Sequence, residues 1–234
     1  MKILSLCQLL AISTCGLMGQ SAVEVLPATS SPIDKRVAGV LPNYRTADGT
    51  IPFEPIGAKM KLTIAAKDSF DYPVYVLSGF FSALGQLSNQ NPSFGQGLKG
   101  YGKRFGTGYG DQMIGNMLAE GTLPALLRED PRYFRIGAGA GSGGYRLRYA
   151  LTRIFVTKTD RNTIRFNFSE IGGNALSTAI SNAYLPDQRN VGDNVQKFST
   201  AIATDAFSNV IKEFWPDVKR KLQAHKAAKA ALHR

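Results

Sequence analysis

Polar side chains recur at helical spacing in two separate stretches of this sequence, and they include acids that could act in catalysis. Gln112, Asn116 and Glu120 fall at i, i+4 and i+8 on one helix face. A second stretch repeats the spacing with Glu170, Asn174, Thr178 and Asn182. If the two stripes face each other, Glu120 and Glu170 form a pair that can act as general acid and base, as in glycoside cleavage.

Asp111 is a third candidate acid, one position before the first stripe. The same spacing also fits a solvated helix face, or a buried polar network that only fixes the packing. The sequence alone leaves these alternatives open, because nothing in it shows that the two stripes meet.

Histidine and cysteine are too rare, and too close to the ends, to support other catalytic chemistries. His225 and His233 both lie in the last ten residues, so the body has no histidine base or ligand. Cys7 and Cys15 both lie in the first 22 residues. We therefore expect no metal site, no cofactor and no Ser-His-Asp or thiolate catalysis.

Two glycine-rich stretches match the residue spacing of nucleotide-binding motifs but lack the other features that those motifs need. Gly97 to Lys103 has P-loop spacing, but Arg104 stands where a Ser or Thr would bind magnesium. Gly139 to Gly144 fits G-x-G-x-x-G without a βαβ unit around it. We expect neither a nucleotide nor a nucleic acid as partner.

The N-terminus predicts export. Lys2 precedes an uncharged apolar run over Ile3 to Gly19, and small residues follow up to Ala22, as in a secretory signal peptide over residues 1–22. A variant is lipidation at Cys15, because Ile12-Ser-Thr-Cys15 nearly matches the bacterial lipoprotein box. Either way we expect a location in the periplasm or at the outer membrane.

The charge is strongly positive, with a formal net charge of +11 at pH 7. Basic residues cluster near the C-terminus as candidate binding residues: Lys219, Arg220, Lys221, Lys226 and Lys229. Long-range attraction predicts anionic partners, and outside the cytoplasm these are anionic lipids or acidic envelope polymers.

Breaker residues divide the chain into three parts after the signal peptide. Residues 23–56 contain five of the eleven prolines of the chain, and we predict this segment to be an extended arm. Residues 57–216 show helical segments with start and stop signals, and Thr157 to Phe168 alternates as a small hairpin. Trp215-Pro216 predicts a helix end, so residues 217–234 form a separate basic helix. The fold class is mainly α, a single helical domain with one small β-hairpin; an outer-membrane β-barrel is the alternative.

Gly102, Gly106 and Gly110 recur every four residues. Such a stripe exposes bare backbone along one helix face, which favours a close crossing with a neighbouring helix of a soluble bundle.

Several passages together carry a family resemblance, among them Lys67-Asp-Ser-Phe-Asp-Tyr-Pro73, Glu129-Asp-Pro-Arg-Tyr-Phe134 and Glu213-Phe-Trp-Pro-Asp217. Over most of residues 38–222 the chain resembles a group of uncharacterised exported envelope proteins of environmental bacteria. The resemblance implies a bacterial origin and one co-folded domain. It implies no activity, ligand or catalytic residue.

These patterns favour an exported envelope protein with a structural or binding role and a basic tail for anionic surfaces. The alternative is a cofactor-free hydrolase of envelope polymers that uses Glu120, Glu170 or Asp111. A concave pocket with two carboxyl groups roughly 5 to 10 Å apart would favour the enzyme. Stripes that are hydrogen-bonded to each other would favour the binding protein.

Overall fold

The computed structural model describes residues 36–37 and 41–232. All of them belong to one unit of the chain, Pro32–Arg234. The predicted signal peptide, the lipidation candidate Cys15 and the first part of the predicted arm lie outside the described residues.

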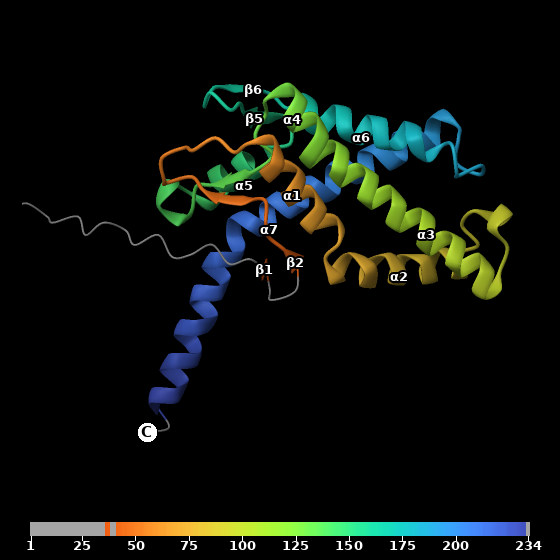
Figure 1. The fold of residues 1–234 in the computed structure, drawn as a ribbon. Helices are drawn as coiled ribbons and strands as arrows, with labels where there is room; N and C mark the ends of the chain where they lie inside the picture. Colours follow the sequence, from red (N-terminus) through yellow and green to blue (C-terminus); the bar gives the residue numbers. More distant parts are fainter. Residues whose placement is uncertain (1–35, 38–40, 233–234) are drawn as a thin grey trace, which may run out of the picture. The chain divides into compact units, whose positions relative to one another are not determined.

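The described chain is mainly α-helical, as predicted (Figure 1). The α-helices are α1 (Ala58–Ser69), α2 (Tyr72–Leu87), α3 (Gly97–Asn116), α4 (Leu123–Leu127), α5 (Gly143–Thr152), α6 (Phe168–Ser181) and α7 (Val191–Leu232). Shorter turns are the 3-10 helices η1 (Pro92–Phe94) and η3 (Ala138–Ala140) and the π-helical η2 (Met117–Thr122), which joins α3 to α4.

Three of these helices begin at a residue whose side chain accepts a hydrogen bond from the first turn, which is a side-chain cap. The Asp71 carboxylate accepts from the Tyr72 N–H, and Pro73 occupies the first turn of α2. Asn167 caps α6 in the same way, by accepting from the Glu170 N–H, and Ser142 caps α5. Each cap satisfies a main-chain donor that the helix itself leaves without a partner.

Three short strand pairs accompany the helices. The predicted hairpin is present as β5 (Val156–Lys158) against β6 (Ile164–Phe166). Within the predicted extended arm, β1 (Arg36–Val37) pairs with β2 (Leu41–Pro42), and β3 (Thr46–Asp48) runs parallel to β4 (Tyr133–Arg135). Proline removes the donor only at its own position, so the proline-free β3 can hydrogen-bond to a strand distant in sequence.

Helix α7 continues through Pro216, so the predicted helix end at Trp215-Pro216 is wrong. A proline inside a helix costs about 3 kcal/mol or more through one lost hydrogen bond and a clash with a carbonyl. Contacts on both sides of the proline offset this cost, since Arg146 of α5 binds both Glu213 and Asp217. The boundary predicted between residues 216 and 217 is therefore not a helix boundary.

The predicted glycine stripe faces open space. A Cβ added at Gly102, Gly106 or Gly110 would meet nothing within 4 Å among the described residues. The close approach occurs at Gly173 of α6, where an added Cβ would lie 2.6 Å from the Cα of Ala119 in η2. The spacing of the three glycines predicted a close helix crossing on this face of α3, but no neighbouring helix of the described residues packs closely against it.

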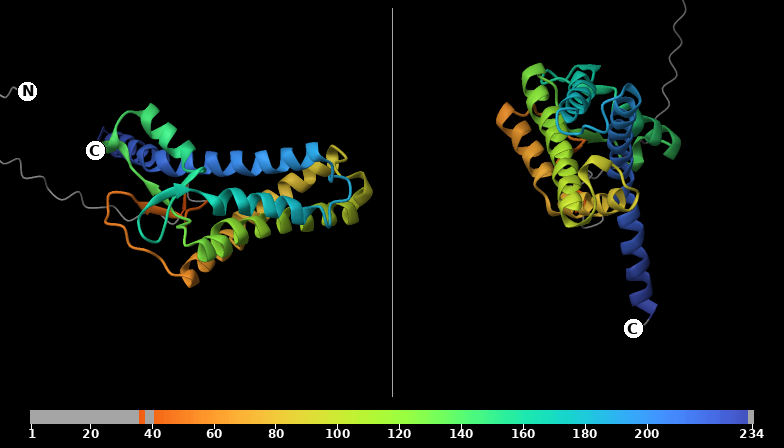
Figure 2. Two further views of the ribbon diagram at one scale, coloured as in Figure 1. Left: turned by 90° about the horizontal axis from the view of Figure 1, so that it is seen from above. Right: turned by 90° about the vertical axis from the view of Figure 1, so that its right-hand side faces the viewer.

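The helices pack with α3 against α2 and α6, and with α6 against η2 and α7. Figure 2 shows α3, α6 and the first half of α7 running alongside one another. Buried polar and charged side chains outnumber buried apolar ones among the described residues, and many large apolar side chains are exposed. This is the reverse of the usual distribution in water.

Over the described residues, none of the helices combines the length and the apolar character that crossing a bilayer would need.

Candidate functional site

Arg45 joins the two glutamates that the sequence singled out. It lies between β2 and β3, and its guanidinium binds Glu120 of η2 through one terminal nitrogen. The other terminal nitrogen donates to Glu170 Oε2 of α6 at 3.5 Å. All three side chains are buried. The two stripes therefore do meet, through a residue that sequence analysis did not select.

Local sequence explains how the two glutamates come together. The Asn167 cap starts α6 so that Glu170 falls in its first turn. Gly173, one turn later, lets α6 approach the backbone of η2 at Ala119. Glu120 is the residue after Ala119, so this close approach sets the distance between the two carboxyl groups.

Three further charged side chains complete a charge cluster around Arg45, of which Asp68 and Lys212 are buried and Asp205 is half-buried. Asp68 of α1 and Asp205 of α7 act electrostatically on the Arg45 guanidinium together with both glutamates. Lys212 of α7 is the second cation of the group. The cluster thus holds four carboxyl groups against two cations, and full ionisation would leave it with excess negative charge.

The electrostatics of the cluster follow from burial. Burial raises the pKa of Glu120 well above its ordinary value, although Arg45 opposes this shift. Burial and the nearby Asp205 raise the pKa of Glu170 to about 8. Burial and repulsion by Arg45 lower the pKa of Lys212. A charge in a low-dielectric interior is costly, so the pKa values of Glu120, Glu170 and Lys212 are each shifted in the direction that favours the neutral form.

The carboxyl groups contact each other in two pairs. Glu120 is within hydrogen-bonding contact of Asp68, and Glu170 of Asp205. Asp68 Oδ1 and Glu120 Oε2 are both buried without a hydrogen-bond donor among the described residues. A carboxyl–carboxyl hydrogen bond requires a proton on one partner. The cluster therefore requires protons, or another source of donors and positive charge.

A cavity of about 450 Å³ opens beside this cluster between α3, α6 and α7. Both predicted stripes line it, Gln112, Asn116 and Glu120 from one side and Asn174 and Thr178 from the other. Asn182 is not among the lining residues, and its side chain accepts from Lys197 instead. Glu170 does not line this cavity, whereas Asp205 does.

Asp111 also lines the cavity, at the end away from Arg45. Its carboxylate accepts a hydrogen bond from the Tyr184 hydroxyl of the segment after α6. Burial raises the pKa of Asp111, while the Tyr184 hydrogen bond and Lys197 oppose the shift. Asp111 and Glu120 both line the cavity, and their separation of nine residues in the sequence corresponds to about 13 Å along a helix.

No family model, no curated protein and no solved structure matches the chain. The arguments about function therefore rest on geometry and chemistry.

The arrangement of Glu120 and Glu170 fits a packing network better than an acid–base pair. Both carboxylates are engaged by the same guanidinium, and Asn174 Nδ2 donates to Glu170 Oε1 at 3.2 Å. Only Glu120 of the two lines the cavity. Among the described residues no group of three or more His, Cys, Asp or Glu is arranged to hold a metal ion.

The sequence does contain a pattern that points to Asp205 and Lys212 as members of a buried polar cluster. Asp205, Asn209 and Lys212 follow one another at i, i+4 and i+7, which makes a third polar stripe. Asn209 and Lys212 are buried. Arg45 had no such signal, because its partners lie on elements far along the chain.

Sequence analysis also missed a second buried network, which is centred on Glu213, the residue that follows Lys212 in α7. The Glu213 side chain is 0 % exposed and accepts from Tyr133 Oη at 2.8 Å and Arg146 Nε at 2.8 Å. The main-chain N–H groups of Ile136 and Gly137 donate to it at 3.2 and 3.0 Å. Every partner serves to fix α7 against β4 and α5, so this network is structural.

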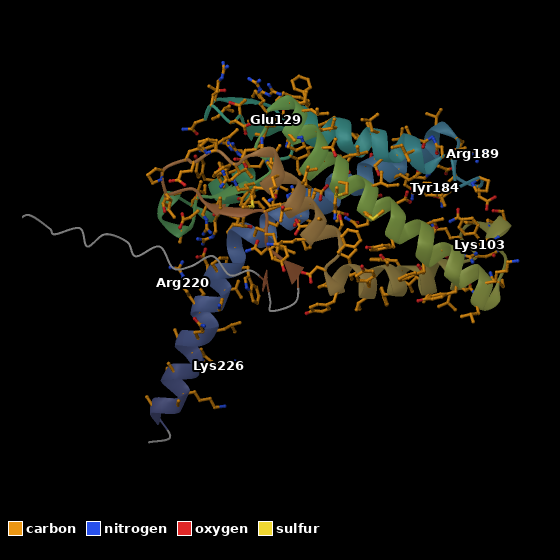
Figure 3. All side chains as sticks on the ribbon, in the orientation of Figure 1. Lys103, Glu129, Tyr184, Arg189, Arg220 and Lys226 are labelled. Carbon is orange, nitrogen blue, oxygen red and sulfur yellow. The ribbon has the colours of Figure 1, made fainter. Side chains whose placement is uncertain are left out.

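The predicted tail residues are in the last part of α7, where Figure 3 labels Arg220 and Lys226. Lys221, Lys226 and Lys229 are exposed, whereas Lys219 is half-buried and Arg220 pairs with Asp217. Three of the five predicted cations are therefore freely presented on the helix surface.

Proposed function

We propose that this chain is an exported, non-enzymatic envelope protein that binds the surface of an anionic membrane. The observation that carries the proposal is the outward apolar face of α2, defined by Val76, Leu77, Phe80, Phe81, Leu84 and Leu87. All six side chains are exposed, with Phe80 at 58 % and Phe81 at 63 %.

Helix α2 turns its small and polar residues inwards. Ser82 and Gly85 are buried. The Gln86 amide donates to the Gly97 carbonyl at 2.8 Å and accepts from Arg104 of α3 at 2.8 Å. The polar side of the helix is thus committed to α3, which leaves the apolar side to face outwards.

Such a face is unfavourable in water and favourable in an apolar environment. Fully burying one large apolar side chain is worth about 1.5–3 kcal/mol. A contiguous exposed apolar patch is a typical site of membrane or protein interaction. A helix with one apolar face binds a bilayer by lying in the interface, with that face among the upper acyl chains.

The charges around α2 favour lipids with anionic headgroups as the occupant. Helix α2 itself contains no charged residue. Exposed lysines flank it, with Lys67 before its start and Lys99 in the first turn of α3. Lys103, one turn further along α3, is also exposed (Figure 3). Each basic residue near an anionic membrane adds about 1 kcal/mol to binding. Lys221, Lys226 and Lys229 form a second basic surface that supports the same attraction.

Vesicle co-sedimentation tests the proposal. The full chain should bind vesicles that contain phosphatidylglycerol more tightly than phosphatidylcholine vesicles. The double variant Phe80→Ser and Phe81→Ser should weaken binding by about tenfold or more, since it removes two of the largest apolar groups. Phe207→Ser is the matched control, because Phe207 of α7 is also 63 % exposed but lies outside this face.

Truncation after Asp217 separates the two surfaces. The shortened chain should retain binding through α2 and its flanking lysines and should lose the part of the salt-dependent binding that the tail contributes, because exposed charges are screened within about 10 Å at 0.1 M salt. Equal loss by Phe207→Ser, or binding to an acidic polysaccharide but not to vesicles, would contradict the proposal.

The alternative is a cofactor-free hydrolase of envelope polymers, and the cavity that holds Glu120, Asp111 and Asp205 is the observation in its favour. The engagement of Glu120 and Glu170 by Arg45 argues against it. Hydrolysis of peptidoglycan or an acidic polysaccharide that is lost in Glu120→Gln and kept in Glu54→Gln would establish the alternative.

A further inference from the structure

The cavity between α3, α6 and α7 is acidic, in a chain with a net charge of +11. Four carboxylates line it and two cations oppose them. The carboxylates belong to Asp111, Glu120, Asp193 and Asp205, and the cations to Arg45 and Lys197. Such a local reversal of sign concentrates positive charge from solution.

The inner end of the cavity leaves one carboxylate oxygen without a hydrogen-bond donor, although Arg45 donates to Glu120 Oε1 and Asn174 Nδ2 donates to Asp205 Oδ2 at 3.5 Å. One member of each carboxyl pair reaches the cavity wall, Glu120 from its pair with Asp68 and Asp205 from its pair with Glu170. Glu120 is 5 % exposed, and its Oε2 has no donor among the described residues. A bound ammonium group supplies a donor for Glu120 Oε2 and adds positive charge beside four carboxyl groups that Arg45 and Lys212 offset only in part.

The outer end presents Asp111 and Asp193 beside Lys197. The Lys197 ammonium donates to Ser181 Oγ at 3.0 Å and to the Gln188 carbonyl at 2.9 Å, so it is occupied in linking α7 to the end of α6. It does not form a salt bridge with either carboxylate within the described part of the chain. A second ammonium group therefore finds acceptors here as well.

We propose that this cavity binds a linear oligoamine, a flexible chain that carries two or more primary or secondary ammonium groups. One ammonium group lies between Glu120 and Asp205, and another lies near Asp111 and Asp193. Nine residues separate Asp111 from Glu120, which is about 13 Å along a helix, and twelve separate Asp193 from Asp205, about 18 Å. An extended oligoamine spans such a distance.

The lining disfavours two other ligand classes, anions and quaternary ammonium ions. An anion would face the excess of carboxylates. Among the described residues that line the cavity none is aromatic, so a quaternary ammonium would lack an aromatic cage. The volume of about 450 Å³ falls in the range of about 300–1,000 Å³ that is typical of small-molecule sites.

Isothermal titration calorimetry of the full chain with spermidine tests the proposal. Because the chain carries net positive charge, a polycation gains nothing from its overall charge, and binding must come from a local acidic site. We expect one-to-one binding, weaker binding of putrescine, and no binding of sucrose. An ammonium group that replaces shared protons should also release protons, which appears as a heat that depends on the ionisation enthalpy of the buffer.

Asp205→Asn and Asp111→Asn should each weaken spermidine binding by about tenfold, the loss of one charge-assisted contact. Glu54→Gln is the matched control, since it removes an exposed acid outside the cavity. Helical circular dichroism and the melting temperature of each variant without ligand report whether it is folded. The proposal is overturned if folded Asp205→Asn and Asp111→Asn both bind as the wild type does, if sucrose binds and spermidine does not, or if no heat is observed at millimolar spermidine.

Discussion

Arg45 and Glu120 form a buried ion pair although 75 residues separate them in the sequence. The pair closes the inner end of the cavity and links the predicted arm to the helical core. It also places an arginine among four carboxyl groups, so the loss of one charge changes the electrostatic energy of every other charged group in the cluster. The stability of this end of the protein should therefore depend strongly on both residues.

Arg45→Met should lower the free energy of unfolding by about 3–5 kcal/mol, because it leaves buried carboxylates without their cation. Arg189→Met is the control, since Arg189 is exposed. Urea denaturation measures both variants. An Arg45→Met protein as stable as the control would show that the ion pair contributes little.

Stability should fall as the pH rises from about 4.5 to about 8. Burial, followed by Asp205, raises the pKa of Glu170 from 4.5 to about 8. The folded chain therefore holds more protons than the unfolded chain in this window, and stability is lost as the pH rises through it. The raised pKa of Glu120 acts in the same direction, and the lowered pKa of Lys212 acts in the opposite one.

Glu170→Gln isolates the contribution of that group to the pH dependence. The variant keeps a neutral side chain at all pH values, beside Arg45, Asp205 and Asn174. Its urea midpoint should change less with pH than that of the wild type, and Glu54→Gln should match the wild type. Identical pH profiles for Glu170→Gln and the wild type would rule out this assignment.

Gly173→Ala should destabilise the fold by about 1–3 kcal/mol, because the new methyl group would stand 2.6 Å from Ala119 and overpack the contact. Its neighbour provides the control: a Cβ at Gly172 would meet Leu123 at an ordinary 3.7 Å. Gly172→Ala should be neutral or stabilising by up to about 1 kcal/mol, the gain in helix propensity. Thermal melts compare the two, and equal effects would argue against the close approach.

Export should remove about the first 22 residues, because Ile3 to Gly19 supplies the uncharged apolar run that a signal peptide needs. N-terminal sequencing of protein recovered from the envelope should begin near Val23. A lipid-modified Cys15 would establish the lipoprotein variant, and an intact Met1 would exclude cleavage.

Local sequence determined the capped starts of α2, α5 and α6 and the spacing of the polar stripes. Asp71 and Pro73 fix the start of α2 through one hydrogen bond and one fixed dihedral angle, and neither depends on distant residues. The periodicity likewise predicted that Glu120 and Glu170 occupy polar helix faces. These features were predictable because they rest on interactions within a turn or two of helix.

The tertiary structure decided which of those faces meet, and through which residue. Arg45 reaches Glu120 and Glu170 because two tertiary contacts bring them together. β3 pairs with β4, and the absence of a side chain at Gly173 lets α6 pack closely against η2. Pro216 stays helical because Arg146 binds on both sides of it. The direction of the apolar face of α2 was likewise set by α3, which takes the polar side. Contacts between residues far apart in the sequence determine each of these outcomes, and no local pattern encodes such contacts.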